Sequence, residues 1–235
     1  MSKTAAAGGG TRGGSPLAPR LVGFPPAGAL GADAAECEAA PCAEVGAEPS
    51  PEPRYLILGS FPSAQSLERR EYYGNPRNHF WSIVAACLGK LEPKTYGGKL
   101  ALLREARIAL WDVYAACERP GSLDKDITAG APNPLGEFIS RHPDIEAIGL
   151  NGGTAAAAFA AGLRGIGWPN SGHLVEELIP RLARAGDTAL WRPGFDPSRE
   201  LRIARLPSTS PVPTAGFRTA EDKLPLWRRF FTIQM

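Results

Sequence analysis

Four short apolar runs, each closed by polar, Gly or Pro residues, limit the possible folds of this chain most strongly. The first run covers residues 55–58 and is closed by Gly59, and the others cover residues 108–113, 145–150 and 201–206. A continuous apolar run of this length is typical of a strand that is covered on both faces. The runs therefore predict the strands of one buried sheet.

Amphipathic patterns lie between and after these runs, over residues 78–88, 98–105, 135–140, 154–161 and 221–231. Strands that alternate with helices imply right-handed crossovers and a parallel sheet. We therefore predict an α/β fold, a three-layer α/β/α sandwich with a central, mainly parallel four-stranded sheet.

The carboxyl ends of the predicted strands indicate where a ligand binds, because parallel sheets bind ligands beyond those ends. This rule places residues 59–63, 112–117, 151–152 and 207–211 around one cleft. The segment 163–200 is rich in Gly, Pro, Arg and Trp, and we interpret it as a long insertion or hairpin without assigned chemistry.

Composition changes abruptly near Arg54. Residues 1–52 are rich in Ala, Gly, Pro and Glu and contain few large apolar side chains, so they cannot offset the entropy lost on ordering. We expect a disordered low-complexity tail over 1–52 and one folded domain over 53–235.

Charge and hydropathy leave the partner open. The formal net charge is +2, so any DNA-binding signal must be local. No run approaches the roughly 20 apolar residues of a membrane span, and the first residues lack the apolar stretch of a secretory signal. We expect a soluble, intracellular, cytoplasmic protein with no membrane partner.

An aromatic cluster follows the first predicted strand. The turn 59–63 combines Gly and Pro, which leaves backbone N–H groups facing a ligand. Residues 72–81, YYGNPRNHFW, place aromatic rings beside Asn, Arg and His, which suits a flat heteroaromatic ring. In the alternative interpretation, Phe80 and Trp81 are ordinary core residues of an amphipathic helix.

These motifs make the chain recognisable. The sequence GSFPS at 59–63 and the segment 72–81 resemble the hypoxanthine-DNA (deoxyinosine) glycosylases of the uracil-DNA glycosylase superfamily. The sequence LPSTSP at 206–211 resembles the second superfamily motif, and NGG at 151–153 also resembles the family. The resemblance covers about residues 54–232. It implies a uracil-DNA glycosylase-like fold and a monofunctional base-excision repair enzyme that hydrolyses the N-glycosidic bond of a flipped, deaminated base in DNA.

The resemblance also implies a catalytic residue. Many superfamily members carry Asn or Asp in the first motif, where this chain has Phe61. The deoxyinosine branch supplies its amide from the Pro-Arg-Asn segment, so the resemblance assigns water positioning to Asn78. In the alternative interpretation, Asn78 caps a helix, and the two roles are compatible. Such hydrolysis needs a positioned water and a stabilised leaving base, so we expect no metal and no cofactor.

The resemblance assigns further residues to the base and to the DNA strand. Phe80 would stack on the base and Asn151 would read it, although Asn151 also suits a turn. The predicted base-binding set is Gly59, Ser60, Phe61, Pro62, Ser63, Tyr73, Phe80 and Asn151. The predicted DNA-binding set is Arg77, Ser208, Thr209, Ser210 and Pro211, with Val212 helping to fill the space left in the duplex.

Charged residues near the motifs have less specific interpretations. Arg69, Arg70, Arg77, Lys223, Arg228 and Arg229 form a basic rim that meets phosphates or only solvent. Leu206 replaces the histidine that begins the second motif in some members, so we assign no catalytic histidine and interpret His79, His142 and His173 as surface or helix-end residues. Asp112 and Asp126 are the acidic residues nearest the cleft, and Asp112 is the second candidate for orienting a water.

Some superfamily branches bind a four-iron cluster through four cysteines. Only Cys117 matches the position of one of these ligands, since Cys37 and Cys42 have the wrong spacing and Cys87 lies on a predicted helix. We predict reduced thiols and no cluster.

Three other functions stay open. Uracil is an alternative main substrate, because it and hypoxanthine both present a carbonyl beside a ring N–H. A non-catalytic DNA-binding module of the same fold is a second alternative, kept open by Phe61. A nucleotide-binding α/β protein of another kind is disfavoured by the absence of GxGxxG and Walker-type motifs. We expect a monomer that needs no protein partner.

Overall fold

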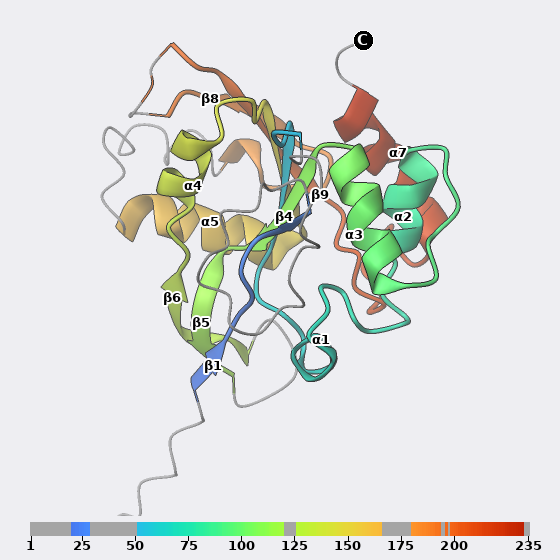
Figure 1. Cartoon of the computed structure of the whole chain (residues 1–235). Helices are drawn as coiled ribbons and strands as arrows, with labels where there is room; N and C mark the ends of the chain where they lie inside the picture. Colours follow the sequence, from blue (N-terminus) through green and yellow to red (C-terminus); the bar gives the residue numbers. More distant parts are fainter. Residues whose placement is uncertain are drawn as a thin grey trace, which may run out of the picture.

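A computed structural model of the chain describes residues 20–28, 51–119, 126–165, 180–193, 196 and 198–232. Among these residues, the elements form two sheets with helices packed around the larger one (Figure 1).

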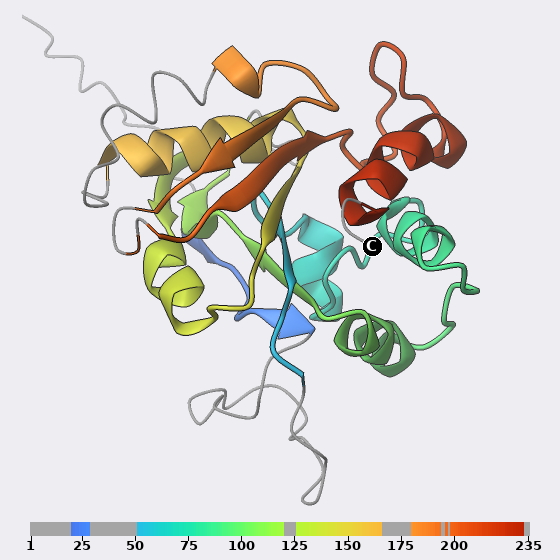
Figure 2. The same cartoon turned by 90° about the horizontal axis from the view of Figure 1, so that it is seen from above.

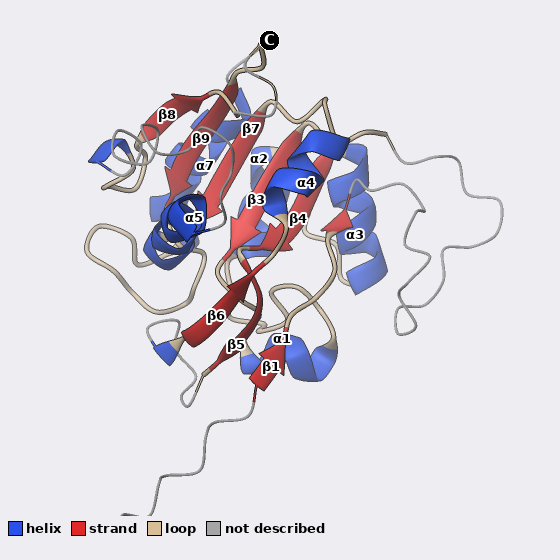
Figure 3. Ribbon diagram, turned by 90° about the vertical axis from the view of Figure 1, so that its left-hand side faces the viewer, coloured by secondary structure: helices blue, strands red, loops and turns tan. Residues whose placement is uncertain are grey.

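The central sheet has the predicted parallel strands in the order β4-β3-β7-β9 (Figure 3). They are β3 (Tyr55–Gly59), β4 (Ile108–Asp112), β7 (Ala147–Asn151) and β9 (Leu201–Leu206). Each neighbouring pair is parallel, with Tyr55 opposite Ile108 and Asn151 opposite Leu206. The mainly parallel α/β fold is therefore confirmed.

The sheet is wider than the predicted four strands. A fifth strand, β8 (Thr188–Trp191), pairs antiparallel with β9, and the two-residue β2 (Ala27–Gly28) pairs antiparallel with β4. β8 lies inside the segment 163–200, part of which is therefore one arm of a hairpin with β9. Its alternating exposed and buried residues are typical of an edge strand with one face in water, and a search for continuous apolar runs misses such a strand.

Helices cover both faces of the sheet (Figure 2). α2 (Phe80–Cys87), α3 (Tyr96–Glu105) and α7 (Ala220–Thr232) lie on one face, and α4 (Leu135–Arg141) and α5 (Gly153–Gly165) lie on the other. Alternate residues of β3 serve the two sides, since Tyr55 and Ile57 pack with α2, α3 and α7 whereas Leu56 and Leu58 pack with α4 and α5. This period of two explains why the strand had to be apolar throughout.

A small antiparallel sheet was not predicted. It has the order β1-β5-β6, formed by β1 (Arg20–Val22), β5 (Tyr114–Glu118) and β6 (Thr128–Pro132). The short helix α1 (Ala64–Arg69) follows the first motif, capped by Ser63. Figure 3 shows this sheet beyond the carboxyl ends of the parallel strands.

The expectation of disorder over 1–52 is wrong for residues 20–28. β1 pairs with β5 and β2 pairs with β4, so this segment joins both sheets. The indole N–H of Trp111 donates to the Phe24 carbonyl at 3.1 Å, and the Tyr72 hydroxyl donates to the Pro25 carbonyl at 3.0 Å. Such backbone pairing does not need a long apolar run, which is why composition gave no signal. Residues 1–19 and 29–50 lie outside the described residues.

None of the helices within the described residues has the length and apolar character needed to cross a membrane.

Candidate active site

The predicted site residues meet at the carboxyl edge of the parallel strands. Gly59 ends β3 opposite Asp112 of β4, and Asn151 ends β7 opposite Leu206 of β9. The loops that follow these four strand ends carry both sequence motifs, so the topology brings segments far apart in the chain to one edge.

The side chain of Asn151 joins the segment 72–81 to the second motif. Its Nδ2 donates to the Tyr73 hydroxyl at 2.7 Å and to the Thr209 Oγ1 at 2.9 Å. Its Oδ1 accepts from the Thr209 backbone N–H at 2.9 Å. Both ends of the amide are thus engaged by protein groups, and Asn151 fixes Tyr73 relative to the second motif.

Tyr73 covers the aromatic ring that was expected to stack on the base. The rings of Tyr73 and Phe80 are stacked with centroids 4.0 Å apart and an interplanar angle of 16°. Phe80 is fully buried, whereas Tyr73 is half-buried with a left-handed backbone angle φ of 51°. Phe80 is therefore a backing residue, and the accessible aromatic ring of this pair is Tyr73.

Asn78 stands at the start of α2. Its Oδ1 accepts from the Phe80 N–H at 2.9 Å, so it caps the first N–H of the helix from the residue before the N-cap, His79. Its own N–H donates to the Asn75 carbonyl at 2.8 Å. The side chain is half-buried and its Nδ2 has no partner among the described residues. The capping role and an available amide donor thus coexist.

Asn78 and Tyr73 line one polar cavity of about 150 Å³. A cavity of about this volume accommodates a six-membered aromatic ring. Its other walls are contributed by the end of α1, the loop before α2, α2 itself, the segment leading to α3 and α3: Arg69, Glu71, Gly74, Asn75, Pro76, Trp81, Glu92 and Lys99. Arg77, in the same loop, is exposed.

The first motif is held in place by Arg119, a residue that the sequence analysis did not identify. Arg119, itself buried, donates from Nη1 to the Pro62 carbonyl at 2.9 Å, and its guanidinium lies 5.4 Å from the centre of the Phe61 ring. Phe61 is 5% exposed, so its side chain is not presented to a ligand. A single Arg distant in sequence gives no motif by which it can be found.

Two backbone N–H groups of the first motif are available to a ligand. A Cβ on Gly59 would collide with the Asp112 carboxylate, so any larger residue here would require that carboxylate to move. Ser60 is buried, and the Ser63 hydroxyl accepts from the Ser66 N–H at 3.2 Å as the cap of α1. The N–H groups of Phe61 and Ser63 have no acceptor among the described residues.

The second motif forms a tight loop after β9. Thr209 is fully buried, and its hydroxyl accepts from Asn151, so it is an anchor and not an exposed DNA contact. The Ser208 hydroxyl accepts from the Ser210 N–H and the Ser210 hydroxyl accepts from the Val212 N–H, each at 3.2 Å. Pro211 is half-buried, and Val212 is 55% exposed.

Lys223 is not part of the predicted basic rim, because it is 1% exposed. Its Nζ lies 3.0 Å from the His79 Nδ1 and donates to the Ser210 carbonyl at 2.9 Å. The His79 N–H donates to the Thr209 carbonyl at 2.9 Å. Burial lowers the pKa of Lys223, and burial followed by the Lys223 charge lowers the pKa of His79. The helical period of α7 gave the signal, since Lys223 shares a face with Trp227 and Phe230.

The remaining charged candidates lie as follows. Asp112 is buried with its carboxylate against Gly59, and Asp126 is half-buried just before β6. His142 binds Glu52 at 2.9 Å near the amino ends of the strands, and His173 lies outside the described residues. Arg69, Arg70, Arg228 and Arg229 are exposed.

The cysteines are separated in the fold. Cys117 is buried on β5, and burial raises the pKa of Cys87 on α2 to about 12. Cys37 and Cys42 lie outside the described residues. Within the part of the chain that the structure describes, no group of three or more His, Cys, Asp or Glu side chains is arranged to hold a metal.

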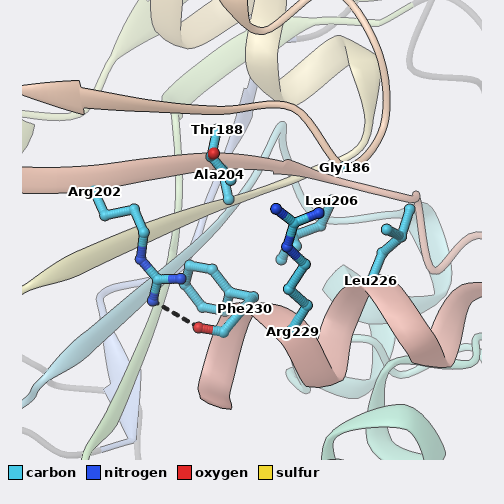
Figure 4. A pocket seen from close by; sticks show the side chains of 8 residues that line it. All are labelled: Gly186, Thr188, Arg202, Ala204, Leu206, Leu226, Arg229 and Phe230. Carbon is cyan, nitrogen blue, oxygen red and sulfur yellow. Dashed lines mark hydrogen bonds between the residues drawn. The ribbon is translucent and has the colours of Figure 1, made fainter. Parts of the chain in front are cut away.

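A second hollow lies between β9 and α7, lined by residues that include Ala204, Leu226 and Phe230 (Figure 4). Its volume is about 10 Å³, close to the minimum that holds one water. Arg202 closes one side by donating to the Phe230 carbonyl at 2.6 Å. This hollow is too small for a ligand site.

Known proteins share this architecture. A solution NMR structure of a Methanosarcina acetivorans protein assigned as a uracil DNA glycosylase matches with a TM-score of 0.57 and 27% identity, covering 90% of this chain and 96% of that chain. The parallel sheet, the Asn at the end of β7 and the Ser-rich loop after β9 together define a member of the uracil-DNA glycosylase superfamily.

Sequence relatives narrow this class. A hypoxanthine DNA glycosylase of Methanosarcina acetivorans is 40% identical over 114 residues, which cover 48% of this chain and 72% of the relative. One from Methanosarcina barkeri is 34% identical over 98 residues, 41% of this chain and 62% of the relative. No family model matches the chain. The chain belongs to the hypoxanthine DNA glycosylase family.

Proposed function

We propose that this chain is a monofunctional DNA glycosylase that hydrolyses the N-glycosidic bond of hypoxanthine flipped out of DNA. The observation that carries base excision is the cavity lined by the Asn78 amide and the Tyr73 ring, and the choice of hypoxanthine rests on the relatives. An aromatic face and a polar group that can hold water are the two elements that excision of a flat base requires.

In the proposed reaction, the Asn78 amide positions a water whose oxygen attacks C1′ of the sugar. The bond between C1′ and the base breaks, its electron pair leaves with the base, and the proton that the water releases neutralises the departing base. Since an amide is a weak base, most of the acceleration comes from stabilising the leaving base and the oxocarbenium-like sugar. The N–H groups of Phe61 and Ser63 are the candidate donors to the leaving base.

Tyr73 takes the stacking role that the sequence assigned to Phe80. The Phe80 ring supports it from behind, and the bond from Asn151 to the Tyr73 hydroxyl holds its orientation. In this arrangement Asn151 acts on the base through Tyr73 and not by direct contact.

In this proposal, the second motif and Arg77 hold the DNA strand that carries the flipped base. Ser208 and Ser210 keep their hydroxyl protons for phosphate oxygens, because in the turn both hydroxyls act only as acceptors. Arg77 supplies a positive charge, and the exposed Val212 fills the space that the flipped base leaves. One copy of the chain carries every group of this proposal, so we infer a monomer acting on DNA in the cytoplasm.

Uracil is the second candidate substrate. It is favoured by the likeness to the Methanosarcina acetivorans structure assigned as a uracil DNA glycosylase. Uracil is smaller than hypoxanthine and presents the same pairing of a carbonyl with a ring N–H.

A gel assay tests the proposal. Purified protein is incubated with labelled duplexes that carry one hypoxanthine, uracil or xanthine, and alkali then cuts the abasic sites. We expect the fastest excision with hypoxanthine. The absence of cleavage on every duplex at enzyme excess would leave the non-catalytic DNA-binding module as the better explanation.

Asn78→Ala is expected to abolish most excision while DNA binding is retained, because the water loses its amide. The change also removes the cap at the Phe80 N–H, which costs about 1 kcal/mol of stability. Asn78→Ser keeps a capping oxygen but not the amide, and we expect it to be stable yet inactive. Gln65→Ala removes an exposed side-chain amide on α1 that does not line the cavity, so it is the control and should excise normally. Full activity of both Asn78 variants would transfer water positioning to Asp112.

A further inference from the structure

A buried cation that the proposed chemistry does not use lies at the seam between the segment 72–81 and the second motif. Lys223 reaches from α7 to the Ser210 carbonyl and to the His79 Nδ1, at 2.9 Å and 3.0 Å. A buried ammonium is costly unless its hydrogen bonds are satisfied. Among the described residues, no carboxylate forms a salt bridge with Lys223. Its main interactions are therefore with His79 in the segment 72–81 and with Ser210 in the second motif.

This contact determines which ring nitrogen of His79 carries a proton. A carbonyl oxygen only accepts hydrogen bonds, so the Lys223 Nζ is a donor at Ser210, and an ammonium has further protons to donate to His79. A nitrogen that accepts cannot carry its own proton, so the neutral ring is protonated at Nε2. His79 is half-buried, so the ring is only partly covered by protein.

We propose that Lys223 is a positioning residue that holds His79 as the Nε2–H tautomer, and that this N–H donates to a phosphate of the bound DNA strand. The inference rests on the proposed function, since it assumes a DNA strand along the second motif. His79 donates its backbone N–H to Thr209 within that motif, so its ring lies beside the loop expected to grip phosphates.

The charged groups around His79 favour a neutral donor. Lys223 faces the ring from α7 and lowers its pKa, whereas Glu221 on the same helix acts in the opposite direction. Asp222 acts on Lys223. The second motif, residues 207–211, contributes only Pro, Ser and Thr to this seam. Burial is the largest influence on the pKa of His79 and lowers it, so the ring takes up a proton at a lower pH than an ordinary histidine.

The first test uses the unaltered protein. Long-range ¹H–¹⁵N spectra of the histidine ring nitrogens distinguish the two neutral tautomers and the imidazolium. We expect the Nε2–H form of His79 at pH 7, with protonation at a lower pH than in an unfolded peptide. A predominant Nδ1–H form or an imidazolium at pH 7 would overturn the inference without any assay of excision.

The second test compares two substitutions of similar size. The amide nitrogen of Gln reaches close to the position of Nε2, whereas that of Asn corresponds to Nδ1. Binding is measured on a duplex with a tetrahydrofuran abasic analogue, which requires no excision. We expect His79→Gln to bind within about threefold of the unaltered protein and His79→Asn about tenfold more weakly, as for one lost bond to a charged group. Equal affinities of the two variants would contradict the phosphate contact.

Salt dependence separates this contact from an ordinary cation. A neutral donor releases no counterion, so His79→Asn should leave the salt slope of binding unchanged, whereas Arg77→Ala should reduce it by about one. Lys223→Met keeps an apolar side chain in the buried position and removes the ammonium. We expect it to raise the pKa of His79 and to lose the Nε2–H preference in the ring spectrum. An unchanged ring spectrum in that variant would show that Lys223 does not position His79.

Discussion

The Asn151 side chain binds the segment 72–81 and the second motif at the same time. Its donors and acceptor bind Tyr73 and Thr209, and Thr209 is fully buried. A buried backbone N–H that loses its acceptor pays the whole desolvation penalty, because water cannot replace the lost partner. The position of Asn151 is therefore important for folding as well as for the site.

Asn151→Ala is expected to lower the free energy of unfolding by about 2–3 kcal/mol, since it leaves the Thr209 N–H and hydroxyl without their partner. Urea unfolding followed by tryptophan fluorescence measures the change. Asn75→Ala, which removes one half-exposed acceptor, should cost less than about 1 kcal/mol. Similar values for both variants would show that the amide bonds of Asn151 contribute little.

At this scale the sequence predicted that the candidate residues lie together, but not how they contact one another. Asn78, Tyr73 and Asn151 do meet at one edge, because strand ends are set by apolar runs that can be read directly. That Tyr73 covers Phe80 depends on a left-handed backbone angle at Tyr73, and non-glycine residues rarely adopt this angle. Such a choice is made by tertiary contacts and leaves no pattern in the sequence.

At the scale of elements, two glycines show how backbone geometry decides their replaceability. Gly97 lies in the first turn of α3, is exposed and has no atom within 4 Å of an added Cβ. Gly152 follows β7 with φ of 98°, and an added Cβ would lie 2.8 Å from the Ser208 Cβ. The same substitution therefore has opposite effects at these positions.

Gly97→Ala is expected to raise the free energy of unfolding by about 0.5 kcal/mol through helix propensity. Gly152→Ala should lower it by about 1–3 kcal/mol, because the left-handed angle and the contact with Ser208 both become unfavourable. Thermal and urea unfolding measure both changes. A stabilising effect of Gly152→Ala would mean that the loop after β7 relaxes freely.

The elements that the sequence predicted are those with one dominant period. The strands of the parallel centre are mostly apolar, and α2 and α7 each bury one face. β6, by contrast, has the sequence TAGAP, in which Gly and Pro argue against a strand. It pairs antiparallel with β5, so its strand conformation depends on a partner strand and not on local propensity.

For the molecule as a whole, residues 20–28 tie the small sheet to the central one. β1 adds to β5 and β2 adds to β4, while Phe24 packs edge-to-face on Tyr72 with ring centroids 5.2 Å apart. This segment lies beyond the boundary that composition suggested, so the folded unit is larger than residues 53–235.

Two truncations test that boundary. Removing residues 1–19 should leave the melting temperature and excision unchanged, because no described contact is lost. Removing residues 1–28 should lower the melting temperature by about 5 °C or more, since two strand pairings and the acceptors for Trp111 and Tyr72 are lost. Equal melting temperatures of the two truncations would show that the segment binds only weakly.

The burial of Lys223 also allows chemical labelling to report when this part of the protein opens. An amine reagent such as acetic anhydride modifies lysines that water reaches, and Lys223 is 1% exposed whereas Lys90 has a side chain that is 42% exposed. Acetylation at Lys223, measured by mass spectrometry, therefore shows how often α7 separates from the loops that carry His79 and Ser210. Comparing its labelling rate with and without DNA measures how firmly the substrate closes that seam.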